Sequence, residues 1–139
     1  MTGRTVESSS RSAPPVVRIA ATLLVAYGVV VVLNAALLQS AAGWAEWRDF
    51  PRALVRLGGM SLVAWGLLRG VRPAWWVAVV LGLLWFGAGV VTVGLMATGY
   101  APLALPGASL LFVSLSLALL GAAVATLLTP GGRAPFRRT

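Results

Sequence analysis

The chain has 139 residues, of which 59% are hydrophobic and only 10% are charged, and its mean hydropathy is +0.91. A water-soluble domain of this size could not bury so much apolar surface, so the composition excludes an ordinary soluble fold and indicates an integral membrane protein. The formal net charge of +8 comes from eleven arginines against three acids, and cysteine, histidine and lysine are absent.

The N-terminal residues 1–15 are rich in serine, end in Pro14 and Pro15, and lack an apolar pattern, which predicts a disordered tail. The apolar run that follows ends near Ser40-Ala41-Ala42, where small residues suit a signal peptidase. It is longer than the apolar core of a signal peptide, which spans about 7 to 15 residues. We therefore expect the run to remain as the first membrane span.

Four apolar segments predict helices over about 16–41, 51–69, 74–99 and 104–128. A bilayer core of about 30 Å needs about 20 helical residues, so the fold class predicted is an all-α integral membrane protein with a four-transmembrane-helix bundle. The second segment is the shortest, because only twelve uncharged residues separate Arg56 from Arg69. A full span must begin near Pro51, which suits a first helical turn, and must carry Arg56 about one turn inside.

The arginines fall between these segments or near their ends, and their distribution predicts the orientation. Eight would share one side: Arg4, Arg11, Arg18, Arg69, Arg72, Arg133, Arg137 and Arg138. Only Arg48, Arg52 and Arg56 would face the other side, so the positive-inside rule places both termini in the cytoplasm. Residues 129–139, opening with Pro130-Gly131-Gly132, then read as a helix stop followed by a basic cytoplasmic tail. On this reading the positive charge meets anionic lipid headgroups and not nucleic acid.

Tryptophans and small residues predict the contacts of the helices. Trp44 and Trp47 on one side, and Trp75 and Trp76 on the other, are expected as anchors at the two membrane interfaces. Small residues four apart allow helices to approach closely, which holds helices together in lipid. These residues are Gly66 with Gly70, Ala78 with Gly82, and a longer ridge of Ser114, Ala118, Ala122 and Thr126. The ridges fit packing within one bundle or against another subunit, and the sequence leaves both open.

Most catalytic chemistry is excluded by missing residue types. Without histidine, cysteine and lysine, the chain lacks the usual general base, thiol nucleophile, zinc and haem ligands and Schiff-base amine. Glu46 and Asp49 are the only neighbouring carboxylates, and the nearby Arg48 and Arg52 favour salt bridges over a metal site. We expect no enzyme activity, no cofactor and no metal.

One set of polar residues inside the apolar segments is a candidate site. Asn34, Arg56 and Thr92 each lie about four to six residues to the outer side of the centre of their segments, which predicts one polar layer roughly 6 to 9 Å beyond the midplane. An ionisable residue inside a membrane is a functional candidate, and a guanidinium could bind an anion or a lipid phosphate. Alternatively, Arg56 snorkels to the headgroups while Asn34 and Thr92 connect helices.

An aromatic residue followed by glycine recurs in three segments, in Leu24-Val25-Ala26-Tyr27-Gly28, Leu62-Val63-Ala64-Trp65-Gly66 and Trp85-Phe86-Gly87. Duplicated helices are one explanation of this weak echo, but a biased composition produces such matches easily.

The function expected is that of a non-catalytic small membrane protein, a subunit or assembly and scaffold partner of a membrane complex. Small-residue ridges, short loops and missing reactive groups favour it, and its partners would be other membrane subunits or further copies of itself. The alternative is a small homo-oligomeric transporter or channel with a polar site around Arg56. Abundant arginine, alanine, glycine and proline, which use GC-rich codons, favour a bacterial inner membrane as the location.

Overall fold

The computed structural model describes residues 12–42, 49–99 and 107–137, which form α-helices and no strand. In chain order the helices are α1 (Pro15–Ala42), α2 (Asp49–Leu68), α3 (Arg72–Ala97), α4 (Gly107–Leu128) and α5 (Pro130–Arg137). The first four begin and end within three residues of the segments predicted from hydropathy. The predicted disorder of the N-terminal tail concerns mainly residues 1–11, which lie outside the described residues.

The turn between α2 and α3 is defined by local chemistry. Gly70 has φ +73°, and its N–H donates to the carbonyl of Leu67 while the Val71 N–H donates to that of Gly66. This pair of bonds is a Schellman cap, which uses a glycine in the left-handed conformation to end a helix. Pro73 then stands in the first turn of α3, where its missing N–H has no consequence.

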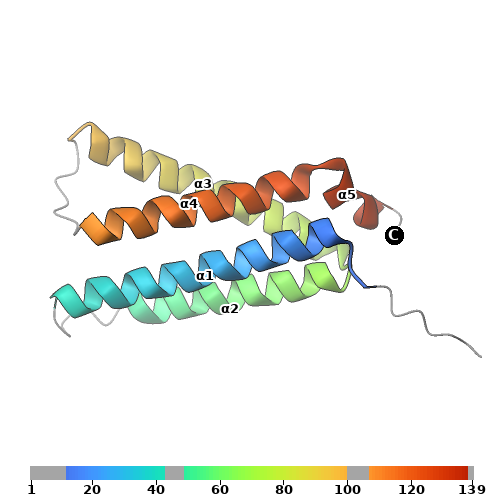
Figure 1. Ribbon diagram of the computed structural model, residues 1–139, viewed down its shortest axis with the longest axis horizontal. Coiled ribbons are helices and arrows are strands. Elements are labelled where there is room, and N and C mark those ends of the chain that lie inside the picture. Colours follow the sequence, from blue (N-terminus) through green and yellow to red (C-terminus); the bar gives the residue numbers. More distant parts are fainter. Residues whose placement is uncertain (1–11, 43–48, 100–106, 138–139) are drawn as a thin grey trace, which may run out of the picture.

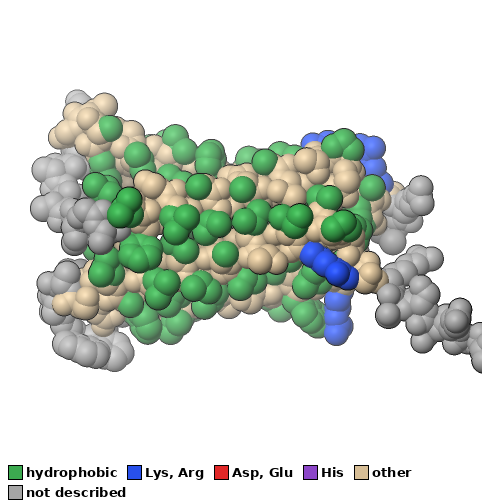
Figure 2. Space-filling model, viewed as in Figure 1, with side chains coloured by type: hydrophobic (Ala, Val, Ile, Leu, Met, Phe, Trp, Pro, Cys, Tyr) green, Lys and Arg blue, Asp and Glu red, His purple; other side chains and the backbone are tan. Residues whose placement is uncertain are grey.

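Helices α1 to α4 run lengthwise beside one another with alternating direction (Figure 1). The start of α1, the end of α2, the start of α3, the end of α4 and the whole of α5 therefore meet at one end. The described arginines gathered there are Arg18, Arg69, Arg72, Arg133 and Arg137, and we call this the arginine end (Figure 2). The other end, where α2 and α4 begin, is the far end.

The outer surface identifies the chain as a membrane protein. Large apolar side chains cover it (Figure 2), including Val55 at 76% and Leu84 at 63% exposure. Three helices are long and apolar enough to cross a bilayer, at 15–40, 72–97 and 110–128. The predicted all-helical fold is thus confirmed for the described residues, with three candidate membrane spans. Helix α2 is long enough, but Arg52 and Arg56 lower its mean hydropathy.

The core lies mainly toward the arginine end, between α1, α2, α4 and the first half of α3. Its largest fully buried side chains are Leu24, Leu67, Leu120, Leu127 and Val17. The basic C-terminal segment joins this core: residues 130–137, expected to be part of a tail, form α5 and bury Phe136 to 4% exposure. The two prolines and two glycines of residues 130–137 disfavour a helix in the sequence, so its contacts with the other helices stabilise it.

Candidate functional site

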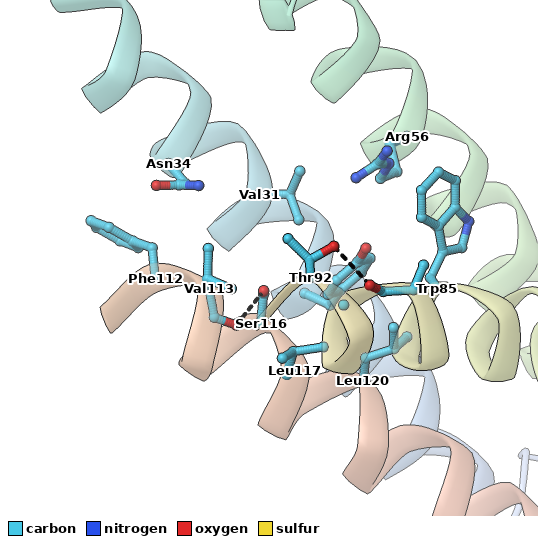
Figure 3. A pocket seen from close by; sticks show the side chains of 13 residues that line it. Val31, Asn34, Arg56, Trp85, Thr92, Phe112, Val113, Ser116, Leu117 and Leu120 are labelled. Atoms are coloured by element: carbon cyan, nitrogen blue, oxygen red, sulfur yellow. Dashed lines mark hydrogen bonds between the residues drawn. The ribbon is translucent and has the colours of Figure 1, made fainter. Parts of the chain in front are cut away.

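A cavity of about 260 Å³ lies between α1, α2, α3 and α4 (Figure 3). Its polar lining consists of Tyr27, Asn34, Arg56, Thr92 and Ser116. The three residues predicted as a polar layer from the sequence therefore line one cavity, although they come from three different helices. We call this cavity the Arg56 pocket.

Arg56 is held against an aromatic ring. Its guanidinium carbon lies 3.8 Å from the centroid of the Trp85 ring, and the guanidinium also interacts with the Tyr27 side chain. A cation over an indole is stabilised by about 0.5 to 2 kcal/mol, with the larger values in desolvated sites. The contact with Trp85 therefore reduces the cost of a half-buried positive charge in an apolar helix.

The contact with Trp85 of α3 shows how deep Arg56 lies along the helix bundle. Trp85 stands in the middle of α3, thirteen residues after Arg72 and twelve before Ala97. Thr92 is seven residues, about 10 Å, closer to the far end than Trp85. Asn34 is displaced in the same direction, since Gly28, six residues before it, packs against Leu57 of α2. The pocket is thus elongated, with Arg56 at mid-helix depth and Asn34 and Thr92 nearer the far end.

The threonine and serine hydroxyl groups of the pocket are engaged within their own helices. Thr92 Oγ1 donates to the carbonyl of Ala88 at 2.8 Å, and Ser116 Oγ donates to that of Val113 at 2.8 Å (Figure 3). Each oxygen retains lone pairs that can accept a hydrogen bond. Arg56 is the single charged residue among those lining the pocket, so the site is electropositive and suits an anionic or electron-rich group.

The paired small residues of α2 and α3 lie in different surroundings. Gly66 is buried, and a Cβ there would meet the Ala74 side chain; Ala78 is also buried, and a Cβ at Gly82 would meet Val124 of α4. Gly70 differs, because it lies beyond the end of α2 in the turn and is exposed. Gly66 and Gly70 therefore do not form a continuous ridge on one helix.

The long ridge of α4 lies on its outer face. Ser114, Ala118 and Ala122 are exposed, and Thr126 is half-buried, with its hydroxyl donating to the Ala122 carbonyl at 2.6 Å. The opposite face of α4, with Leu120, Ala123 and Leu127, enters the core. The sequence left open whether this ridge packs within the bundle or against another subunit. Among the described helices, none covers its first three residues.

The predicted interface tryptophans of α3 both lie at the arginine end. Trp75 Nε1 donates to the Leu127 carbonyl at 3.2 Å, and Trp76 packs edge-on against Trp75 and is 56% exposed. Trp44, Trp47 and Glu46 lie outside the described residues. Among those that are described, no group of three potential metal-ligating acids, histidines or cysteines occurs.

Sequence reasoning did not assign Tyr27 and Trp85 to the site. The sequence did contain a signal, because both residues belong to the repeated aromatic–glycine pattern. In the structure both contact Arg56. Trp65, the remaining aromatic residue of the first two motifs, stacks with Arg69 at 3.8 Å. Aromatic residues from two of the three motifs thus meet at one half-buried cation, Arg56.

Comparison with known proteins gives no further assignment. No protein-family model matches the chain, and neither a curated protein nor a solved structure matches it. The geometry of the helices and cavities is thus the basis for proposing a function.

Proposed function

We propose that the protein is a non-catalytic subunit or assembly partner of a membrane complex. The observation that carries this proposal is the outward position of the α4 ridge, where Ser114, Ala118 and Ala122 are exposed. In lipid, burial of apolar area gives little drive for association, and close backbone approach across small residues is the main source of helix contacts. An exposed ridge of this kind suits a helix from another subunit or from a second copy.

Helix α3 adds a second uncovered surface. None of its described residues beyond Gly82 is buried, and large side chains such as Val91 (61% exposed) face outward. One side of this part of α3 packs on α4, where a Cβ at Gly89 would meet Leu117, and its other side is uncovered. A partner could therefore pack on α3 and α4 without displacing the core.

Purification of the tagged protein in mild detergent tests the assembly role. We expect a stable partner, or a defined oligomer, to accompany the wild type, and Ala118→Leu with Ala122→Leu to release it by blocking close approach. Ala36→Leu, at an exposed alanine of α1, is the matched control. A monomer with no partner, or equal loss in the control, would contradict the proposal.

The proposed topology has four spans in a bacterial inner membrane, with the arginine end in the cytoplasm. The positive-inside rule supports this side, because five described arginines gather there. Helix α2, about 30 Å long for 20 residues, is the span with the weakest hydropathy. Helix α2 lies lengthwise beside α1 (Figure 1), and the Trp85 ring covers the guanidinium of Arg56. Both observations support α2 as a transmembrane helix.

Introduced cysteines test the topology, since the chain has none of its own. Exposed positions near helix ends are Ser40, Val71 and Thr98, which avoid the two glycines with positive φ. We expect Ser40→Cys and Thr98→Cys to react with an impermeant maleimide from outside the cell, and Val71→Cys only after lysis. Labelling of Ser40→Cys and Val71→Cys from the same side would show that α2 does not cross.

The second candidate function is a small homo-oligomeric transporter or channel, and the Arg56 pocket is the observation that favours it. An arginine at mid-helix depth that lines a cavity is typical of an ion or substrate path. Anion flux into proteoliposomes, with chloride and phosphate as probes, tests this function. Flux that Arg56→Leu abolishes and Arg52→Leu retains would support it, whereas absent flux would reject it for these anions.

A further inference from the structure

A second cavity, of about 270 Å³, lies at the arginine end between α3 and α5. It is lined by Arg72, Trp75, Trp76, Arg133, Phe136 and Arg137. None of these residues belongs to the Arg56 pocket. We call this cavity the three-arginine cavity.

The cavity exists because α5 folds back onto the other helices. A Cβ at Gly132 would lie 2.5 Å from the Thr126 carbonyl oxygen and 2.8 Å from that of Leu127, so glycine permits this close approach. Phe136 of α5 is buried, and its ring centroid lies 6.4 Å from that of Trp75. The arginines of α5 are thus held beside the first turns of α3.

The positive charges of the cavity have no acidic counterpart among the residues that line it. Arg133 and Arg137 are four residues apart, so they lie on one face of α5 and repel each other. Arg72 stands in the first turn of α3, where the helix dipole disfavours a cation, and that turn contains no acid. Three like charges around one cavity therefore create a strong attraction for an anion.

Arg133 provides a second, independent observation. Its Nε is buried and makes no hydrogen bond within the part of the chain that the structure describes. A buried unpaired donor on a charged group is costly, and an anion beside the guanidinium offsets that cost. Since Arg133 lines the cavity, an anion there would supply that compensation.

We propose that the three-arginine cavity binds a phosphate group that carries a net negative charge. Guanidinium groups match phosphate oxygens in a two-pronged geometry, and three of them favour an anion over a zwitterion. Trp75 and Trp76 are typical of the headgroup level of a membrane, so an anionic phospholipid or a soluble phosphate compound could provide the group. The inference concerns a site separate from the α4 ridge and holds whether or not the chain assembles with a partner.

Native mass spectrometry of the full chain in detergent tests the site. The lipid probes are phosphatidylglycerol and phosphatidylcholine with identical acyl chains, and inorganic phosphate is the soluble probe. We expect phosphatidylglycerol to bind preferentially, and Arg133→Gln/Arg137→Gln to weaken it by at least about tenfold, as expected for the loss of charged hydrogen bonds. Arg133→Lys keeps the charge but lacks the planar guanidinium, so its affinity for phosphatidylglycerol should lie between those of the wild type and the double variant.

Arg69→Gln is the matched control, since Arg69 lies at the same end, is exposed, stacks on Trp65 and does not line the cavity. Circular dichroism checks that every variant is folded. Competition by inorganic phosphate would support a soluble phosphate source, and binding of phosphatidylglycerol without competition would support a lipid source. Equal loss in Arg69→Gln, equal binding of the two lipids, or binding of neither probe would overturn the proposal.

Discussion

The half of the molecule near the arginine end and the half near the far end differ in how tightly their helices pack. Near the arginine end, α1 buries Val17, Ala20 and Leu24, and a Cβ at Gly82 of α3 would meet α4 at Val124. Toward the far end, Ala53 is the main buried side chain among the described residues. Helix α3 has no buried residue beyond Gly82, although a Cβ at Gly89 would still meet Leu117 of α4. The Arg56 pocket opens where this change occurs.

This difference in packing between the two halves shows where a polar side chain can lie between the helices. Close-packed helices leave no room for a guanidinium, because interiors fill nearly all available space. Where the residues of α3 are no longer buried, Arg56 and Trp85 fit beside one another and a cavity remains. We call the half near the arginine end the tight half and the half near the far end the open half. The tight half contains most of the buried core, and the open half contains the Arg56 pocket and the exposed part of α3.

The largest expected effect is the loss of a core side chain from the tight half. Leu24 is 0% exposed, so Leu24→Ala should lower the free energy of unfolding by about 2 to 5 kcal/mol through lost contacts and a cavity. Leu84→Ala, at a 63% exposed position of α3, should have little effect. Thermal unfolding in detergent micelles measures both, and similar losses would contradict the difference between the halves.

The attachment of α5 gives the next effect. Gly132→Ala should destabilise the chain by about 1 to 3 kcal/mol, because the new methyl group meets two carbonyl oxygens of α4. Gly131→Ala is the adjacent control, since its Cβ would meet only Val16 at 3.4 Å. Limited proteolysis of the C-terminus and circular dichroism report the change, and equal resistance of both variants would argue against a docked α5.

A smaller effect is expected from the contact between Arg56 and Trp85 in the open half. A double-mutant cycle with Arg56→Met and Trp85→Leu should give a coupling of about 0.5 to 2 kcal/mol, the range of a cation over an indole. Unfolding in detergent measures the four variants. A coupling near zero would indicate that Arg56 leaves the ring and snorkels to the membrane surface.

The smallest effect concerns the hydroxyl groups of the pocket. Thr92→Val should change stability by about 0.6 kcal/mol or less, because the Thr92 hydroxyl bonds to the Ala88 carbonyl of its own helix. Ser116→Ala should behave similarly for the same reason. Thermal unfolding of the two variants gives the comparison, and a loss as large as that of Leu24→Ala would show that these hydroxyls connect helices.

Hydropathy predicted the helices well because membrane insertion depends on local properties. Long apolar runs and the prolines and glycines between them mark where α1 to α4 begin and end, whatever their neighbours. Depth along each helix was also taken from residue number, which grouped Asn34, Arg56 and Thr92 at one level. The three line one cavity, but the contact with Trp85 places Arg56 deeper than the other two.

The sequence by itself determined an apolar, helical, arginine-flanked chain, since these properties are written in consecutive residues. Only the tertiary structure decided which face each helix presents: the α4 ridge points outward, Arg56 stacks on Trp85, and α5 brings Arg133 beside Arg72. Helices α3 and α4 are apolar on all sides, so no pattern within them distinguishes a face for lipid from a face for protein. Their rotation depends on contacts between residues far apart in the chain, which local patterns do not encode.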